Sequence, residues 1–241
     1  MAGAVRVLVT RPEPGASHTA RRLEELGFLP IVLPLSETVA IGTETLSGQY
    51  DAVAITSVNA VRHADPAMIE RLAYLPAYAV GHKTAGAAKS AGFAEVTAAG
   101  GDGEALATKL SSVLRPGAHV LYLAGRVRRP DFETKARAAG LELTVCETYD
   151  TAAIGHRDIG PRLGDVSIDV ALIYSAFAAK ALVDLVERRE IADNSVNFWN
   201  KTRFLCLSSR ISESLPEQWK ARALISERPD EQSLLNLLAS L

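Results

Sequence analysis

The chain has 241 residues, of which 48% are hydrophobic and 22% charged, and its formal net charge is −2. This composition is typical of a globular protein with one large or two small cores, and it excludes a broad basic surface for nucleic acid. No apolar run approaches the roughly 18 residues that a membrane helix needs, and the N-terminal sequence lacks the layout of a signal peptide. We therefore expect a cytoplasmic protein that binds neither nucleic acid nor a membrane.

The first half of the chain alternates predicted strands with predicted helices. A strand over residues 5–10 precedes a helix over 16–26, which Gly27 ends. The extended segment 28–41 contains Pro30 and Pro34, so it fits a strand that leaves one domain and enters another better than one central strand. The other predictions are a strand at 52–55, a helical pattern through Ala60, Val61, Ala64 and Met68, a strand at 77–80, helices at 84–91 and 104–114, and a strand at 119–123.

The second half continues in the same way. A second extended segment over 141–154 has the length and character of the first. The later predictions are a strand at 170–174, a helix from 176 to about 188, a polar loop at 194–201, a strand at 203–207, a helix at 212–219, a short apolar run at 223–226 and a last helix at 230–238. Strands that alternate with helices of this length are typical of parallel βαβ units.

The pattern also repeats within the chain. The strand and turn that begin at Asp51 recur from Asp169, which is 118 positions later, and Val7 matches Val120 at an offset of 113. A third pair begins at Ala77 and Phe204, which makes a tandem order a-b-c-a′-b′-c′. With two extended crossings, this order predicts two similar parallel-sheet α/β domains joined by a two-stranded hinge. The repeat alone does not choose between that pairing and a simple break near residue 115.

Small polar residues follow most of the predicted strands. At the carboxyl ends of parallel strands, hydroxyls, helix N-termini and backbone N–H groups favour carboxylate or phosphate ligands. The alternatives are that the hydroxyls only cap helices and that the basic cluster formed by Arg126, Arg128 and Arg129 is a solvated loop. The candidate ligand-binding residues are Thr10, Arg11, Thr56, Ser57, Asn59, Gly81, Thr84, Gly125, Arg126, Arg129, Ser175, Ser208, Ser209 and Arg210.

Motifs for other chemistries are absent from the sequence. The five histidines are scattered without metal spacing, and the simplest interpretation is a surface or capping role for each. Cys146 and Cys206 lie in apolar runs, as core thiols in a reducing compartment do. The glycine fingerprints of dinucleotide and phosphate loops and the hydrolase elbow are missing, which argues against a nucleotide-dependent enzyme. The sequence therefore predicts no metal and no cofactor.

The chain resembles the uroporphyrinogen-III synthase family. The resemblance is carried by Val-Thr-Arg-Pro12, Ile-Thr-Ser-Val-Asn-Ala60, Ala-Val-Gly-His-Lys-Thr-Ala85, the spacing from Gly125 to Arg129, and Glu-Thr-Tyr149. These motifs follow one another in the family's order over nearly the whole chain. The second repeat departs from the family, because Ser208-Ser-Arg-Ile-Ser212 replaces its paired threonines and Tyr174-Ser175 replaces the commoner Thr-Ser.

The resemblance implies a fold and an activity. The first α/β domain would comprise residues 1–35 and 153–241, the second would comprise 36–152, and the two would face each other across a cleft. The implied enzyme is a lyase of haem biosynthesis that cyclises the linear tetrapyrrole hydroxymethylbilane to uroporphyrinogen III, with loss of water and inversion of ring D. It works without a metal or cofactor, and we expect it to be a monomer.

The resemblance also assigns roles to single residues. Tyr149 matches the family's tyrosine near the cleft and is the candidate that assists departure of the substrate hydroxyl, although a packing role at the hinge remains open. Thr84 and Ser57 would donate hydrogen bonds to substrate carboxylates, and Arg210 would replace a hydroxyl contact with a charge. The alternative function is that of a non-catalytic two-domain protein that binds a polyanionic small molecule.

Overall fold

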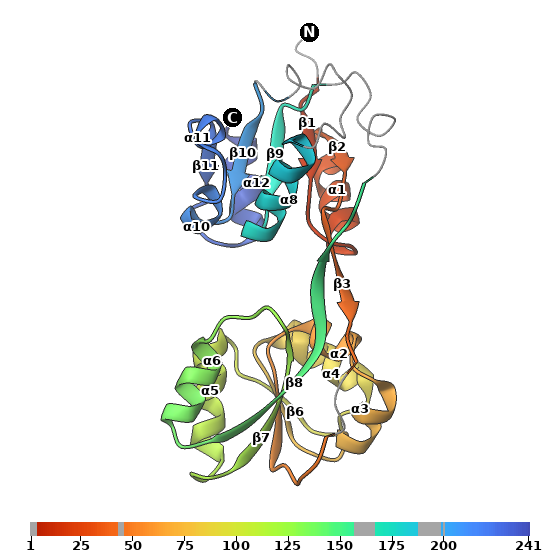
Figure 1. Ribbon diagram of the computed structural model, residues 1–241, viewed down its shortest axis with the longest axis vertical. Coiled ribbons are helices and arrows are strands. Elements are labelled where there is room, and N and C mark those ends of the chain that lie inside the picture. Colours follow the sequence, from red (N-terminus) through yellow and green to blue (C-terminus); the bar gives the residue numbers. More distant parts are fainter. Residues whose placement is uncertain (1–3, 43–45, 157–166, 188–198, 200) are drawn as a thin grey trace. The chain divides into compact units, whose positions relative to one another are not determined.

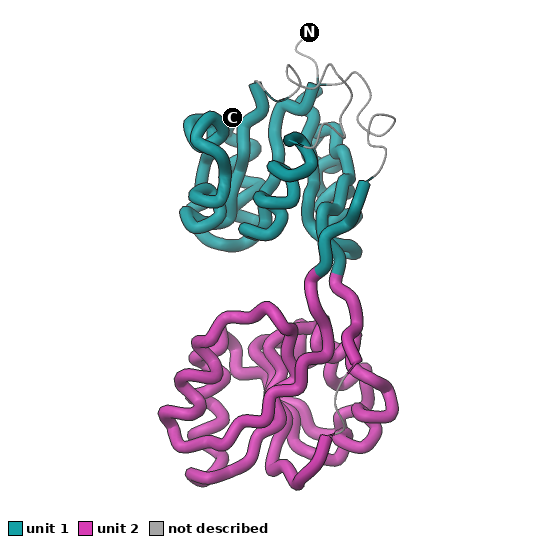
Figure 2. Tube along the Cα trace, in the orientation of Figure 1, with its two compact units in different colours: residues 1–37, 152–241 teal, residues 38–151 magenta. Residues whose placement is uncertain are grey.

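The chain folds into two compact α/β units. The computed structural model describes residues 4–42, 46–156, 167–187, 199 and 201–241. Unit 1 comprises Met1–Glu37 and Ala152–Leu241, and unit 2 comprises Thr38–Thr151, as the two colours of Figure 2 show. The chain therefore passes between the units twice, once in each extended segment of the sequence. Segment 28–41 supplies β2 to the sheet of unit 1 and β3 to the sheet of unit 2.

The described strands of unit 1 form a five-stranded sheet in the order β11-β10-β9-β1-β2, in which all pairs are parallel (Figure 1). Its strands are β1 (Arg6–Val9), β2 (Leu29–Val32), β9 (Val170–Ile173), β10 (Arg203–Cys206) and β11 (Ala223–Ile225). Its described helices are α1 (Gly15–Glu25), α8 (Ala176–Glu187), α10 (Ser209–Ser212), α11 (Glu217–Lys220) and α12 (Glu231–Ala239). Val7 packs in a core with α1 and α12, whereas Leu8 packs in the core beneath α8, α10 and α11, because successive strand residues face opposite sides.

Unit 2 contains a six-stranded sheet in the order β3-β8-β7-β4-β5-β6. Its strands are β3 (Ser36–Ala40), β4 (Ala52–Ile55), β5 (Ala77–Ala79), β6 (Val96–Ala98), β7 (His119–Gly125) and β8 (Glu142–Ala153). The helices are α2 (Val58–Arg62), α3 (Pro66–Leu72), α4 (His82–Ala91), α5 (Gly103–Val113) and α6 (Asp131–Ala138). All four residues of β4 are buried, as expected for a central parallel strand that is covered on both faces.

The predicted sequence repeat is a structural repeat. From the edge inward, the order β11-β10-β9-β1-β2 of unit 1 corresponds to the order β6-β5-β4-β7-β8 of unit 2. Val7 pairs with Val170 and Ala52 pairs with Val120, and these pairs are related by the offsets found in the sequence, since 7 + 113 = 120 and 52 + 118 = 170. The predicted α/β class with parallel sheets is confirmed, and each sheet combines strands from both sequence repeats.

The repeated aspartates have a structural role. The Asp51 carboxylate accepts a hydrogen bond from the backbone N–H of His119 at 2.7 Å, and the Asp169 carboxylate accepts one from the N–H of Arg6 at 2.8 Å. Each donor lies at the beginning of the neighbouring strand, where the ladder leaves a backbone N–H without a strand partner. The repetition of Asp in the sequence therefore reflects how the two sheets begin and not a catalytic site.

Replacing either aspartate by alanine is expected to lower the free energy of unfolding by about 1 kcal/mol, because a charge-assisted hydrogen bond is lost at an exposed edge. Urea denaturation of Asp51→Ala and Asp169→Ala measures this loss. Glu70→Ala is the control, because Glu70 is exposed on α3 and its side chain has no hydrogen bond to a described residue. Equal stability of Asp51→Ala and Glu70→Ala would contradict the role given to Asp51.

Three local predictions were wrong or incomplete. The helical pattern through Met68 is two helices, because Pro66 begins α3 and Asp65 caps it by accepting from the N–H of Ala67 at 3.0 Å. The predicted helix 212–219 is replaced by α10 and α11, with Pro216 as the N-cap of the second. The short strand β6 was not predicted, and most of the predicted polar loop 194–201 lies outside the described residues.

Candidate active site

The predicted ligand-binding turns all follow parallel strands. In unit 2, Thr56 follows β4, Gly81 lies just beyond β5, and Gly125 ends β7. In unit 1, the corresponding turns begin at Thr10, Tyr174 and Leu207, after β1, β9 and β10. Because neighbouring strands run in the same direction, the turns of each unit lie along one edge of its sheet. The structure thus brings the candidates of each unit together at one carboxyl edge.

In the turn after β4, the polar groups mostly bind one another. Ser57 is the N-cap of α2, and its hydroxyl accepts from the N–H of Asn59 at 3.1 Å. Thr56 and Tyr122 share a hydrogen bond of 2.8 Å between their hydroxyls, and burial raises the pKa of Tyr122, so its hydroxyl stays protonated. The predicted capping alternative is therefore realised for Ser57, and Thr56 joins β4 to β7.

The turn after β5 has an open helix end. Gly81 is the N-cap of α4 and has no side chain to accept from the first N–H groups of the helix. No atom lies within 4 Å of the position that a Cβ on Gly81 would occupy, so the backbone at this turn is accessible. Thr84 lies in the first turn of α4 and is buried, with 6% of its surface exposed. The accessible groups of this turn are therefore backbone groups more than the Thr84 side chain.

Tyr149 lies opposite Gly125 at a bulge between β7 and β8. Ala124 pairs with Glu147 and Gly125 with Tyr149, so Thr148 has no partner in β7. The Thr148 hydroxyl donates to the carbonyl of Ala60 at 2.8 Å and lies 3.4 Å from the carbonyl of Ala124. A Cβ on Gly125 would lie 2.5 Å from Cζ of Tyr149, so the aromatic ring packs directly on the glycine.

The hydroxyl of Tyr149 differs from the other hydroxyls of the turns after β4 and β1 in its lack of a partner. Its ring is half-buried, and its hydroxyl forms no hydrogen bond with the part of the chain that the structure describes. The ring of His63 lies 5.9 Å away, centroid to centroid, and His63 Nε2 forms a 2.8 Å hydrogen bond with the Thr38 hydroxyl. Burial and then the charge of Arg62 lower the pKa of His63. Sequence reasoning gave His63 only a surface or capping role, because histidine spacing does not show a contact with a tyrosine 86 positions away (149 − 63 = 86).

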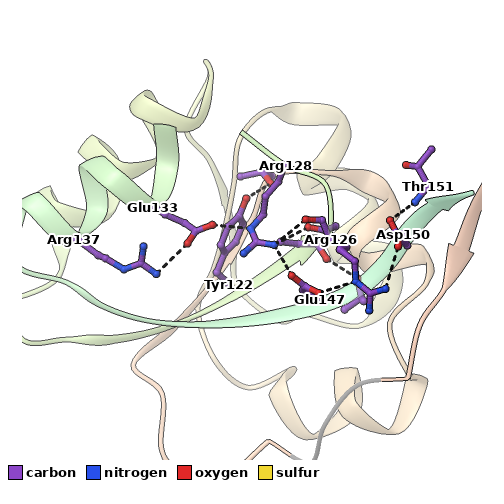
Figure 3. A network of polar contacts seen from close by, with 12 residues as sticks. Tyr122, Arg126, Arg128, Glu133, Arg137, Glu147, Asp150 and Thr151 are labelled. Atoms are coloured by element: carbon purple, nitrogen blue, oxygen red, sulfur yellow. Dashed lines mark hydrogen bonds and ion pairs between the residues drawn. The ribbon is translucent and has the colours of Figure 1, made fainter. Parts of the chain in front are cut away.

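The basic cluster is largely neutralised by carboxylates of unit 2, which Figure 3 shows. Arg126 forms ion pairs of 3.2 Å with both Glu147 and Asp150. Arg128 binds Glu133 at 2.7 Å and Glu147 at 2.8 Å, and the hydrogen bond from Arg128 is the main cause that lowers the pKa of Glu147. The cluster is therefore neither a set of free cations nor a merely solvated loop. Of its three arginines, only Arg129 is exposed without an ion pair to a described residue.

In unit 1 the predicted Arg11 is also engaged. Its guanidinium binds Glu231 at 2.8 Å and lies 4.6 Å above the ring of Tyr174. Burial opposes ionisation of Glu231, but a hydrogen bond from Thr19 and the charges of Arg11 and Arg22 outweigh it, and the pKa of Glu231 is lowered. Arg11 therefore ties α12 to the turn after β1. The partner Glu231 was not predicted, because 220 positions separate it from Arg11.

Two hydroxyls predicted to bind ligand in unit 1 have partners within the fold. Thr10 is fully buried and donates to the carbonyl of Leu172 at 2.8 Å, so its side chain holds β1 to β9. Ser175 accepts from the N–H of Ala178 at 3.0 Å and begins α8 as a cap. The turn after β10 is more open, and its three candidates are Ser208, which caps α10 without a side-chain hydrogen bond, and the exposed Ser209 and Arg210.

Within the described ranges, the structure offers neither a group of three metal-ligating side chains nor a helix with the length and apolar character of a membrane span. What remains is a protein of two repeated α/β units, each of which presents polar turns along the carboxyl edge of its sheet. This arrangement defines the class of two-unit α/β proteins with parallel sheets, a class in which ligands generally bind at strand ends.

The comparisons with known proteins narrow this class to one family. The family model described as uroporphyrinogen-III synthase HemD matches residues 17–236, and the chain belongs to that family. The predicted function, a lyase of porphyrin biosynthesis that forms uroporphyrinogen III, is thereby confirmed. A search of curated proteins found no match.

One solved structure agrees with the fold. The uroporphyrinogen-III synthetase from Helicobacter pylori 26695 superposes with a TM-score of 0.63 at 18% identity, over 98% of this chain and 99% of that one. A mutant uroporphyrinogen III synthase from the extremely thermophilic bacterium Thermus thermophilus gives a TM-score of 0.49 at 19% identity, over 98% of both chains. The wild-type uroporphyrinogen III synthase from Thermus thermophilus gives a TM-score of 0.43 at 19% identity, over 98% of this chain and 97% of that one.

Proposed function

We propose that the protein binds hydroxymethylbilane at the carboxyl edges of its two sheets and that Tyr149 assists the first chemical step. One observation carries this proposal: the Tyr149 hydroxyl has no hydrogen-bond partner in the described part of the chain, and its ring is held against Gly125. A tyrosine that served only to pack would not need to keep its hydroxyl free at the edge of the sheet where ligands bind.

The chemistry begins with loss of the terminal hydroxyl of the substrate. Tyr149 donates a hydrogen bond to that hydroxyl as its C–O bond breaks, and the hydroxyl takes up a proton and leaves as water. One proton is released in turn when the far pyrrole regains its aromaticity after reclosure. The electron pair of the pyrrole fills the deficit at carbon, which gives an azafulvene cation. The hydrogen bond to the departing oxygen is strongest in the transition state, where negative charge develops on that oxygen. An interaction that is stronger in the transition state than in the ground state accelerates the reaction.

The enzyme then directs ring closure. The substituted carbon of the far pyrrole ring attacks the azafulvene carbon and forms a spiro intermediate, whose fragmentation and reclosure leave that ring inverted. Without orientation, the unsubstituted position reacts and the uninverted isomer I results. The main contribution of the protein is therefore to fold the flexible substrate so that the correct carbon lies next to the cation.

Binding of the eight substrate carboxylates is supported by the open groups of both edges. The uncapped N-terminus of α4 at Gly81 supplies backbone N–H groups and the positive end of a helix dipole. Arg129 and Arg210 are exposed and have no ion pair with a described residue, so their charges are free for carboxylates. Ser208 and Ser209 add hydroxyls beside Arg210.

The test is to incubate hydroxymethylbilane with the protein, oxidise the products to porphyrins and resolve isomers I and III. Isomer III is the expected product, formed faster than the spontaneous isomer I. Formation of isomer I alone, at the rate seen without protein, would contradict the function and favour a non-catalytic binder. Gel filtration tests the accompanying proposal that the protein is a monomer, which an elution volume of a dimer would contradict.

A further inference from the structure

Arg128 is the centre of the polar network shown in Figure 3. Its Nε donates to Glu133 at 2.7 Å, and its Nη1 donates to Glu147 at 2.8 Å. The same Nη1 also reaches the carbonyl oxygens of Gly125 at 3.1 Å and Arg126 at 3.2 Å. One guanidinium thus joins α6, β8, the end of β7 and the loop that follows β7.

The residues that Arg128 contacts lie next to Tyr149 on both β7 and β8. Gly125, whose carbonyl accepts from Arg128, lies directly beneath the tyrosine ring. Glu147 precedes the bulge, and Tyr149 follows it after Thr148, the one residue between them without a register partner in β7. A bulge sets the direction of the side chains that follow it, and shifting a strand by one residue turns them to the other face. The Arg128 contacts hold both strands at the point where the direction of Tyr149 is set.

Burial distinguishes Arg128 from the other arginines of the network. Its side chain is 22% exposed and its partner Glu133 is 14% exposed, whereas Arg126 is 55% exposed and Arg137 is 53% exposed. Exposed ion pairs are screened by water and contribute little, whereas partly buried, charge-assisted hydrogen bonds are stronger. Arg137 binds the other oxygen of Glu133 at 3.0 Å without touching the loop, so it is a matched control.

We propose that Arg128 is a positioning residue: by holding the Gly125 carbonyl and Glu147, it fixes the β7–β8 bulge that presents the Tyr149 hydroxyl. The proposal rests on the function proposed above, because it takes Tyr149 as the group that acts on substrate. Arg128 itself has no role in contacting the substrate.

A double-mutant cycle tests this proposal. Arg128→Met keeps the aliphatic stem and removes every donor, and it is expected to lower kcat for isomer III about tenfold with KM changed by less than about twofold. In a Tyr149→Phe background the same substitution is expected to lower kcat less than about twofold, because the effects of two residues that act through one group are not additive. Arg137→Met is expected to change neither constant by more than about twofold.

Three outcomes would overturn the proposal. An equal loss of kcat from Arg128→Met in both backgrounds would mean that Arg128 does not act through Tyr149. A rise in KM with kcat unchanged would mean that Arg128 binds the substrate. An unchanged kcat and KM in Arg128→Met would mean that the β7–β8 bulge keeps its conformation without Arg128.

A second measurement does not depend on catalysis. With fluorotyrosine at the six tyrosine positions, ¹⁹F NMR yields a Tyr149 resonance that is identified by its loss in Tyr149→Phe. Arg128→Met is expected to shift or broaden that resonance, whereas Arg137→Met should leave it unchanged. An unmoved resonance in Arg128→Met overturns the proposal, and a wild-type protein that makes no isomer III overturns the proposed function but not this result. If circular dichroism shows that Arg128→Met does not fold, Glu147→Leu removes the acceptor that Arg128 Nη1 contacts on β8. An unmoved Tyr149 resonance in that variant also overturns the proposal.

Discussion

Tyr149→Phe is expected to lower the rate of isomer III formation by at least about tenfold, because it removes the hydrogen bond to the departing hydroxyl while keeping the ring. The Tyr149 hydroxyl forms no hydrogen bond with the described residues, so its removal leaves no protein group unpaired and should not change stability. Initial rates with hydroxymethylbilane, with the isomers resolved, measure the effect. Spontaneous formation of isomer I should be unaffected.

The control is Tyr74→Phe, since Tyr74 is 76% exposed and lies just after α3. It should retain the wild-type rate within about twofold, as surface substitutions usually do. A loss smaller than about twofold in Tyr149→Phe would contradict the catalytic role, because loss of a proton donor in the transition state costs more than that. Tyr149 would then be a packing residue at the β7–β8 bulge.

Gly125→Ala is expected to lower the isomer III rate at least as much, for a steric reason. The added methyl would lie 2.5 Å from Cζ and 2.8 Å from the hydroxyl oxygen of Tyr149, which is too close, so the ring must move. Overpacking of this kind also lowers the free energy of unfolding by about 1–3 kcal/mol. Rate measurements and urea denaturation on the same protein separate the two effects.

Gly86→Ala is the matched control for this substitution. Gly86 lies within α4, and no atom lies within 4 Å of its added Cβ, so alanine there should raise the free energy of unfolding by about 0.5–1 kcal/mol and leave the rate unchanged. A Gly125→Ala variant with the full rate would contradict the account, because the position of the Tyr149 ring would then not matter for turnover.

Much of the fold could be predicted because the signals are local and repeated. The apolar run of β4 and the acidic residue before it recur in β9. The residues that pair between strands are related by the same offsets as the matching residues of the two sequence repeats. The short strand β6 could not be predicted, since three residues with only partial burial carry no clear period. The break before Pro66 was missed although the sequence carries the signal for it, an Asp-Pro pair at a helix start.

The positions of the candidate residues in the fold could be predicted, but their interactions could not. An apolar strand followed by small polar residues predicts a turn at the carboxyl edge of a sheet, and the predicted residues lie there. Which side chains stay free depends on partners that are distant in sequence: Glu147 is 21 positions from Arg126, and Glu231 is 220 positions from Arg11. Sequence patterns therefore overestimated the number of free cations, and the free Tyr149 hydroxyl emerged only from the three-dimensional contacts.

The central claim is that the protein decides which carbon of the substrate bonds. The most direct measurement is the isomer ratio in a single turnover, with the protein in excess over hydroxymethylbilane and at full binding. The account predicts that the product becomes nearly all isomer III as the protein concentration rises. A product that stays isomer I when all of the substrate is bound would contradict it.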